Sequence, residues 1–364
     1  MSGDMQRWTP NVASIIEHAN EFHPTKEVIS RMVSGEVHRT NYAEVCVRSR
    51  KLASALEKDG YKKGDVIATL ALNTYRHLEM YYGISGMGAI CHTLNFRLHP
   101  EQAVYIINHA DDKIIFCEAP FIPIMEGLKD QLTCVEKYII LCDESEMPET
   151  ALKNAISYEE YISSGDEDYE WPAIDDDAAC GLCYTSGTTG NPKGVLYSHK
   201  SNILHAQASL NAMPIGPDET ILMVVPLFHV LAWGIPYYGP MNGSKLVMPG
   251  MQMEGEPLYD LIDKEEVTLA FGVPTIWMGL LAYCRDNNKI LTSVRNTIIG
   301  GSALSLPTLQ EFDEVHDVNV IHAWGMTEMS PLGTINIPTP EMENMGKEEK
   351  YAIQLKQGKP IYGV

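Results

Sequence analysis

The sequence predicts an α/β protein with mostly parallel sheets covered by helices. Short apolar runs typical of strands alternate with stretches of helical spacing along the chain. The 364 residues, 45% of them hydrophobic, are enough for two domains with substantial cores. A polar, acidic stretch at 163–177 divides the alternation into two series. We therefore expect two similar α/β subdomains, 1–177 and 178–364, packed side by side with a cleft between them.

The first series begins with an amphipathic helix expected at 44–58, capped by Thr40 or Asn41. A helical stretch at 75–87 follows a buried strand. The strands expected in this series are 65–72, 113–117 and 137–142, the last two separated by a helical stretch.

The second series continues the same alternation, and no repeat of 20–50 residues is present. Its expected strands are 179–185, 195–198, 220–225, 245–248, 267–271, 296–299 and 318–322. Helical stretches lie between most of them, as in a parallel sheet with helical crossovers.

The formal net charge is −21, from 48 acidic and 27 basic residues. Such a surface repels a nucleic-acid backbone, so we expect no nucleic-acid partner, and any phosphate site must be locally positive. No apolar run reaches the length of a membrane span, and residues 1–10 lack an apolar signal core. We expect a cytoplasmic protein without stable membrane insertion.

Eight cysteines are scattered along the chain, and one pair has the CxxC spacing, Cys180 and Cys183. This pair lies inside an apolar, strand-like run, and no second pair accompanies it. We expect buried structural thiols, with redox or metal chemistry as the alternative.

The segment 184–195 (YTSGTTGNPKGV) carries the strongest chemical signal. Its glycines allow backbone N–H groups to approach a phosphate chain closely, its hydroxyls add donors, and Lys193 supplies positive charge. It is not a Walker A loop, because Gly187 is followed by Thr-Thr-Gly-Asn-Pro. A surface turn rich in glycine, serine and threonine is the alternative.

This segment resembles the signature phosphate loop of the adenylate-forming superfamily. Three further motifs agree in the family's order: PLFHV at 226–230, GGSA at 300–303 and WGMTE at 324–328. Within the acyl-CoA synthetase branch, residues 38–110 particularly resemble methylmercaptopropionate-CoA ligases, which act in dimethylsulfoniopropionate catabolism, and medium-chain fatty-acid–CoA ligases. The resemblance implies ATP-dependent conversion of a short or medium acid to acyl-AMP and then acyl-CoA, releasing pyrophosphate and AMP.

The resemblance also assigns roles to residues, with ATP, Mg²⁺ and coenzyme A as cofactor and co-substrates. The implied phosphate cradle is Ser186, Gly187, Thr188, Thr189, Gly190 and Lys193. Thr185 and Glu328 match Mg²⁺ positions, Thr327 an α-phosphate contact, and Trp324 an adenine-stacking position where many relatives have tyrosine. Gly301 and Ser302 lie in the motif lining the nucleotide and acyl sites. The expected catalytic residues are Lys193, His229, Thr327 and Glu328.

The implied acyl pocket is lined by Trp233, Val273, Pro274, Gly301 and Gly325. A bulky Trp233 favours short or medium acids, and the alternative is that it only packs a core helix. His229 alone would suit a core histidine, but after Pro-Leu-Phe it is expected to position the carboxylate or ATP. His92, His109 and His205 are expected to be structural.

The resemblance covers essentially the whole chain, yet the family's ribose-binding aspartate, hinge residue and small-lobe lysine have no counterpart in it. We expect the large N-terminal lobe with the small C-terminal lobe absent, able to bind but not to turn over, and compatible with a homodimer. The alternatives are an aryl-acid ligase, a carrier-loading adenylation domain or a non-catalytic nucleotide-binding fragment. An α/β-hydrolase is excluded because the segment 300–304 lacks the final glycine of GxSxG.

Overall fold

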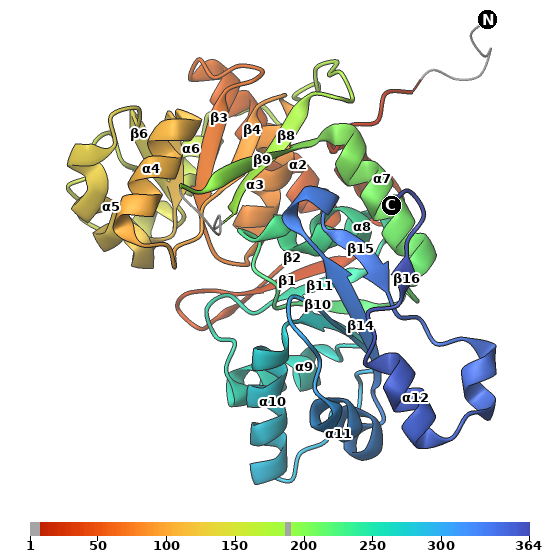
Figure 1. The fold of residues 1–364 in the computed structure, drawn as a ribbon. Helices are drawn as coiled ribbons and strands as arrows, with labels where there is room; N and C mark the ends of the chain where they lie inside the picture. The colour runs from red at the N-terminus through yellow and green to blue at the C-terminus, as the bar shows by residue number, and fades with distance from the viewer. Residues whose placement is uncertain (1–7, 186–190) are drawn as a thin grey trace, which may run out of the picture.

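The computed structural model describes residues 8–185 and 191–364. Its strands form two sheets, one of seven strands and one of nine, which helices separate and cover (Figure 1). In the residues described, no helix is both long and apolar enough to cross a membrane.

The seven-stranded sheet has the order β7-β6-β5-β3-β4-β8-β9. Its strands are β3 (Val66–Leu70), β4 (Ile90–Thr93), β5 (Ile114–Cys117), β6 (Lys137–Ile140), β7 (Ile156–Ser157), β8 (Ala179–Thr185) and β9 (Lys193–Ser198). All neighbours are parallel except β8 and β9, which form an antiparallel hairpin. The hairpin places both ends of the glycine- and threonine-rich segment at one edge of the sheet.

The nine-stranded sheet has the order β16-β15-β14-β13-β12-β10-β11-β1-β2. Its strands are β1 (Glu27–Arg31), β2 (Val37–Asn41), β10 (Thr220–Met223), β11 (Lys245–Met248), β12 (Leu269–Gly272), β13 (Asn296–Ile299), β14 (Asn319–Gly325), β15 (Leu332–Ile335) and β16 (Lys359–Pro360). The central strands are parallel, while β2, β15 and β16 are antiparallel to their neighbours.

The α-helices are α1 (Ala13–Phe22), α2 (Tyr42–Lys58), α3 (Tyr75–Gly86), α4 (Pro100–Ala110), α5 (Ile122–Leu128), α6 (Tyr158–Ser163), α7 (His199–Ala212), α8 (Ile235–Asn242), α9 (Gly255–Glu265), α10 (Pro274–Asp286), α11 (Leu306–His316) and α12 (Lys347–Gln354). The predicted cap of α2 is confirmed, because the Asn41 side chain accepts a hydrogen bond from the Glu44 backbone at 3.0 Å. Side chains of Ser, Asn and Asp stabilise helix starts in this way.

Alternate residues of the central strands enter different cores, so helices and sheets are stacked in alternating layers. In β1, Val28 packs into the core between the two sheets, and Ile29 packs on the outer face of the nine-stranded sheet. Helices α1, α2, α3, α7 and α8 contribute to the core between the sheets. Helices α9 to α12 cover the outer face of the nine-stranded sheet, and α4 and α5 that of the seven-stranded sheet (Figure 1).

The sheets do not divide the chain at residue 177. Strands β1 and β2 belong to the sheet built mainly from residues after 220, where Val28 pairs with Leu246. Strands β8 and β9 belong to the sheet built mainly from residues before 160. The predicted subdomains 1–177 and 178–364 therefore each lend a strand pair to the sheet of the other.

The cysteines are free thiols, and all except Cys134 are buried. Cys180 lies in β8 and accepts a hydrogen bond from the Asn202 side chain at 3.1 Å. Burial raises the pKa of Cys180 to about 12, so this thiol is protonated and inert at neutral pH. The expectation of buried structural thiols is confirmed.

Candidate active site

A cavity of about 490 Å³ brings together side chains from both sheets. Its wall is formed by Thr185, Lys193, Met213, His229, Val230, Trp233, Tyr238, Phe271, Ile298, Gly300, Gly301, Ala323, Trp324, Gly325, Met326, Thr327, Glu328, Pro331 and Leu332. Nine of the residues singled out from the sequence are among them: Thr185, Lys193, His229, Trp233, Gly301, Trp324, Gly325, Thr327 and Glu328. These nine come from distant parts of the chain, and the fold brings them together around one cavity.

Not all predicted site residues line this cavity. Val273 occupies the N-cap position of α10, and its side chain packs against Gly301. Pro274 is the buried first residue of that helix. Ser302 is exposed and is not part of the wall. Ser186, Gly187, Thr188, Thr189 and Gly190 lie outside the described residues.

The β8–β9 hairpin supplies one side of the cavity. Thr185 is the last residue of β8, and its register partner Lys193 is the first residue of β9. The Thr185 hydroxyl donates to the Lys193 carbonyl at 3.5 Å. Lys193 is exposed, and no carboxylate of the described residues forms an ion pair with its ammonium group. Its positive charge is therefore available to an anion in the cavity.

The turn between β14 and β15 supplies the opposite side. It contains a single 3₁₀ turn, Thr327–Met329, and is closed by a hydrogen bond from the Met326 N–H to the Pro331 carbonyl at 3.1 Å. Gly325 is required here, because a Cβ atom would lie 2.2 Å from the Pro331 carbonyl oxygen. Trp324 is 40% exposed, which leaves part of its indole available to a planar ligand.

Trp233 reaches the cavity from a short left-handed turn. Val230, Leu231, Ala232 and Trp233 have φ angles between 48° and 56°, and Gly234 follows with φ 82°. Four consecutive non-glycine residues in this region cost backbone energy, which the burial of Leu231 and Ala232 helps to offset. The turn directs the Trp233 ring against Gly300 and Gly301, whose missing side chains leave room for it.

His229 lies just before this turn, and part of its surface is open to the cavity. The surrounding protein atoms nevertheless lower the pKa of its imidazole, because they desolvate the charged form. A neutral imidazole can donate one hydrogen bond without adding charge to the site.

Most of the apolar wall of the cavity was not predicted from the sequence. Phe271, Ile298 and Ala323 lie near the carboxyl ends of β12, β13 and β14, three parallel neighbours in the sheet. Ligands of parallel α/β sheets bind beyond these ends, so the predicted strand ends carried this signal. Tyr238 is fully buried, and its hydroxyl has no hydrogen-bond partner among the described residues.

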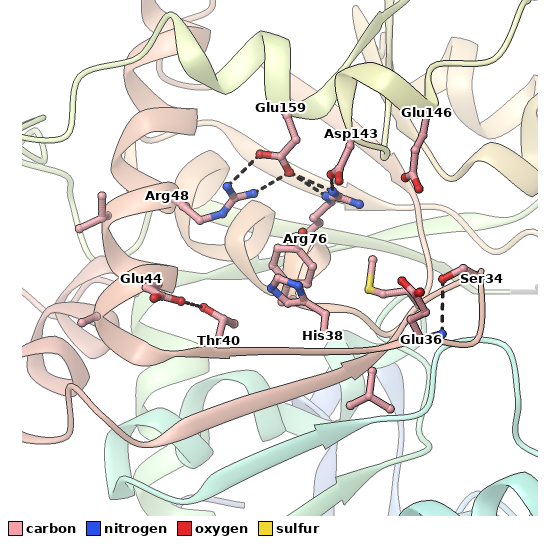
Figure 2. Close-up of a pocket in the computed structure, with 15 residues that line it drawn as sticks. Ser34, Glu36, His38, Thr40, Glu44, Arg48, Arg76, Asp143, Glu146 and Glu159 are labelled. Carbon is pink, nitrogen blue, oxygen red and sulfur yellow. Dashed lines mark hydrogen bonds and ion pairs between the residues drawn. The ribbon is translucent and has the colours of Figure 1, made fainter.

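A second hollow, of about 820 Å³, is lined in part by residues from the stretches 38–44 and 75–76 (Figure 2). Arg48 and Arg76 both bind Glu159, at 2.9 and 3.0 Å, and Arg76 also pairs with Asp143. His38 stacks on the Tyr75 ring with centroids 4.0 Å apart. Its arginines are thus neutralised within the protein and its acidic residues outnumber them, so this hollow is a poor site for a nucleotide.

Comparisons with known proteins identify the family of the chain. Residues 16–364 match the family model described as AMP-binding enzyme. A 3-methylmercaptopropionyl-CoA ligase of Ruegeria lacuscaerulensis is 46% identical over 100% of this chain and 68% of its own. A medium-chain-fatty-acid–CoA ligase of Ectopseudomonas oleovorans is 45% identical over 100% of this chain and 67% of its own. The chain thus spans about two thirds of the length of these relatives.

Solved structures share the fold. The anthranilate CoA ligase AuaEII in complex with anthranoyl-AMP superposes with a TM-score of 0.84 at 20% identity, covering 100% of this chain and 66% of that chain. A long-chain-fatty-acid-CoA ligase from Archaeoglobus fulgidus gives a TM-score of 0.84 at 22% identity, covering 99% and 71%. The α/β architecture predicted from the sequence is therefore confirmed.

Proposed function

Because the chain belongs to the family of AMP-binding enzymes, and within it to the acyl-CoA ligases, we propose that its cavity activates a short or medium carboxylic acid with ATP for transfer to coenzyme A. One observation carries the proposal. Thr185 and Lys193 from one sheet, and Thr327 and Glu328 from the other, line one cavity whose remaining wall is largely apolar. Such a site suits a ligand with a polyanionic end and an apolar end.

The reaction consists of two displacements. A carboxylate oxygen attacks the α-phosphorus of ATP, the bond to the β-phosphate oxygen breaks, and pyrophosphate leaves. The sulfur of coenzyme A then attacks the acyl carbon of the acyl-AMP, its thiol proton is lost, and AMP leaves. The first step brings an anion to a polyanion, so charge neutralisation and alignment are the main contributions the protein can make.

Lys193 is the cation proposed for the β- and γ-phosphates, together with the backbone and hydroxyls of 186–190, which lie outside the described residues. Thr327 is proposed to donate its hydroxyl to the α-phosphate, and Trp324 to stack on adenine. His229, whose pKa is lowered by desolvation, is proposed to orient the attacking carboxylate through an N–H donor. Gly301 and Gly325, which have no side chains, are proposed to leave space in the cavity for the acyl-adenylate.

Magnesium fits the donors that the cavity offers. The Thr185 hydroxyl and the Glu328 carboxylate are oxygen ligands of the kind this hard cation prefers, and both line the same cavity. When bound, the ion supplies positive charge to the phosphate oxygens. The two residues are proposed to hold it, while Lys193 neutralises the remaining phosphate charge.

For the acid, we propose methylmercaptopropionate or a chain of similar length. Trp233 lines the cavity beside Gly300 and Gly301, and its bulky ring is proposed to limit the length of the acyl tail. The 3-methylmercaptopropionyl-CoA ligase and the medium-chain-fatty-acid–CoA ligase at 46% and 45% identity support this choice. A role in dimethylsulfoniopropionate catabolism, a cytoplasmic location and a homodimer stay predictions.

We further propose that the 364-residue chain binds its ligands but does not complete turnover. The family resemblance assigns a catalytic lysine and a ribose-binding aspartate that no residue of this chain matches. Without a counterpart of that lysine, the first half-reaction would lack its positive charge.

Calorimetry on the 364-residue chain tests the proposal, with Mg-ATP and a non-hydrolysable acyl-sulfamoyl adenosine as ligands. We expect both to bind, and Lys193→Ala to weaken Mg-ATP by about tenfold to a hundredfold, the loss typical of a charge-assisted hydrogen bond. The acyl-sulfamoyl adenosine has no β- or γ-phosphate, so its affinity should change little. Lys153→Ala, which removes an exposed lysine that does not line the cavity, is the matched control.

Two outcomes would contradict these assignments. If neither ligand binds the wild-type chain, the cavity is not a nucleotide site. If the 364-residue chain forms acyl-CoA efficiently from ATP, coenzyme A and a short acid, the proposal that it binds its ligands without completing turnover is wrong.

A further inference from the structure

The β14–β15 turn is held at both ends by side chains from the β9–α7 segment. The Tyr197 hydroxyl, on β9, donates to the Thr327 carbonyl at 2.7 Å. His205, in the middle of α7, accepts a hydrogen bond at Nε2 from the Leu332 N–H at 3.1 Å. Thr327 and Leu332 both line the cavity, so these bonds fix the start and the end of one wall.

Both side chains are buried, which makes their bonds hard to replace by water. Tyr197 is 3% exposed and His205 is 7% exposed. Burial lowers the pKa of His205 to about 4, so the ring is neutral at physiological pH. Because Nε2 accepts, the proton of the neutral ring lies on Nδ1, and only this tautomer can hold the Leu332 N–H.

His205 also contacts a second part of the wall. A Cβ atom on Gly234 would lie 2.8 Å from the His205 ring, so the imidazole packs directly on the glycine that ends the left-handed turn. That turn carries Trp233. One side chain of α7 therefore touches both the segment with Thr327 and the segment with the tryptophan.

These contacts cross between the two sheets. Thr185 and Lys193 belong to the seven-stranded sheet, and Thr327 and Glu328 to the turn of the nine-stranded sheet. A nucleotide that contacts both sets requires a fixed separation between them, and small displacements of positioned groups are costly. Tyr197 continues the strand that begins with Lys193, so its bond to Thr327 links the two sets almost directly.

We propose that Tyr197 and His205 are positioning residues that keep the β14–β15 turn in register with the β8–β9 hairpin across the nucleotide site. This inference rests on the proposed function, because it assumes that one nucleotide contacts both sides. Neither residue touches the reacting atoms in this scheme. They act through the backbone of Thr327 and Leu332.

The test compares two variants with two matched controls in the 364-residue chain. Tyr197→Phe and His205→Leu remove the two bonds. Tyr42→Phe removes a buried tyrosine bond to the Ser244 carbonyl, and His316→Leu removes a buried histidine acceptor of the Leu291 N–H. Neither the two control residues nor their two hydrogen-bond partners line the cavity. The controls thus remove the same kinds of buried hydrogen bond at positions away from the cavity.

Two measurements separate positioning from general stability. Hydrogen–deuterium exchange without ligand should show amides 326–334 exchanging about tenfold faster in Tyr197→Phe and His205→Leu, since each loses one buried hydrogen bond. Calorimetry should show Mg-ATP affinity falling by about tenfold in the same variants. The controls should lower the melting temperature without either local effect. His205→Gln, whose side-chain carbonyl can accept the same N–H, should recover part of the loss.

The outcomes are distinct. Unchanged exchange in both variants, or equal acceleration in the controls, would overturn the positioning role. Faster exchange with unchanged Mg-ATP affinity would also overturn it, because the turn would then be held without consequence for binding. If the wild-type chain does not bind Mg-ATP, the proposed function fails, and the exchange data alone decide whether the two side chains hold the turn.

Discussion

His77 gives a prediction whose size follows from the structure. It lies in α3 and is fully buried, with Nε2 3.0 Å from the Thr69 hydroxyl and Nδ1 3.0 Å from the Leu72 carbonyl. The carbonyl can only accept, so Nδ1 carries the proton and Nε2 accepts from the hydroxyl. A second proton would have to displace the Thr69 bond in an apolar core. Burial accordingly lowers the pKa of His77 from 6.5 to about 3.

The sign of the pH dependence follows from this lowered pKa. Below pH 6.5 the unfolded chain binds a proton at His77, whereas the folded chain does not bind it until about pH 3. The unfolded state is therefore favoured progressively as pH falls through this window, by about 1.4 kcal/mol for each step of one in pH. Between pH 7 and pH 5, this residue alone should remove about 2 kcal/mol from the free energy of unfolding.

The assay is urea unfolding of the 364-residue chain at pH 7, 6 and 5, compared with the variant His77→Gln. The variant should be less stable at pH 7, because it disturbs two buried hydrogen bonds. The free energy of unfolding of the variant should nevertheless fall less steeply as the pH is lowered. The difference in slope should approach about 1.4 kcal/mol per pH unit, the value for the uptake of one proton. Parallel pH profiles for the two chains would refute the reasoning, because they would show that His77 does not contribute to the loss of stability in acid.

Further substitutions test the cavity wall. Trp233→Ala should shift the preference among acyl-sulfamoyl adenosines towards longer tails, each newly buried CH₂ contributing about 0.8 kcal/mol, and an unchanged preference by calorimetry would mean that Trp233 does not limit length. Gly325→Ala should weaken the same ligands by more than about tenfold, because its Cβ would collide with the Pro331 carbonyl. Tyr238→Phe should leave the free energy of urea unfolding unchanged or raise it by about 1 kcal/mol, since it removes a buried hydroxyl without a partner among the described residues. Tyr42→Phe should lower it by about 1–2 kcal/mol, because its hydroxyl binds the Ser244 carbonyl, and equal effects of the two would contradict the assignment.

Much of the architecture could be predicted because it is written in local patterns. The apolar run 65–72 contains β3, and the cap at Asn41 begins α2. Strands β1 and β2 were not predicted. They are short, and β1 is stabilised by pairing with β11, more than 200 residues away, which no local pattern reports.

The site was predictable where its chemistry has a characteristic sequence. The family resemblance implied one common site for the segments around Lys193 and Glu328, and both residues line the same cavity. His205 carried no such signal, since a histidine in a helix acquires a role only from the turn packed against it. Val273 and Pro274 lie one layer behind the wall, a difference of depth that spacing along the chain does not encode.

The exchange of strand pairs between the sheets has a consequence for how the chain becomes folded. The hairpin of β1 and β2 leaves the ribosome early but has no parallel neighbour until β11 has been made. The nine-stranded sheet therefore cannot be completed before its last strand, β16, has been synthesised, and the edge of β1 that pairs with β11 must stay unpaired or protected until β11 is made. Cutting the chain at residue 177 would leave each half without two strands of its own sheet. We expect such halves to aggregate when expressed separately and to need one another, or a chaperone, to fold.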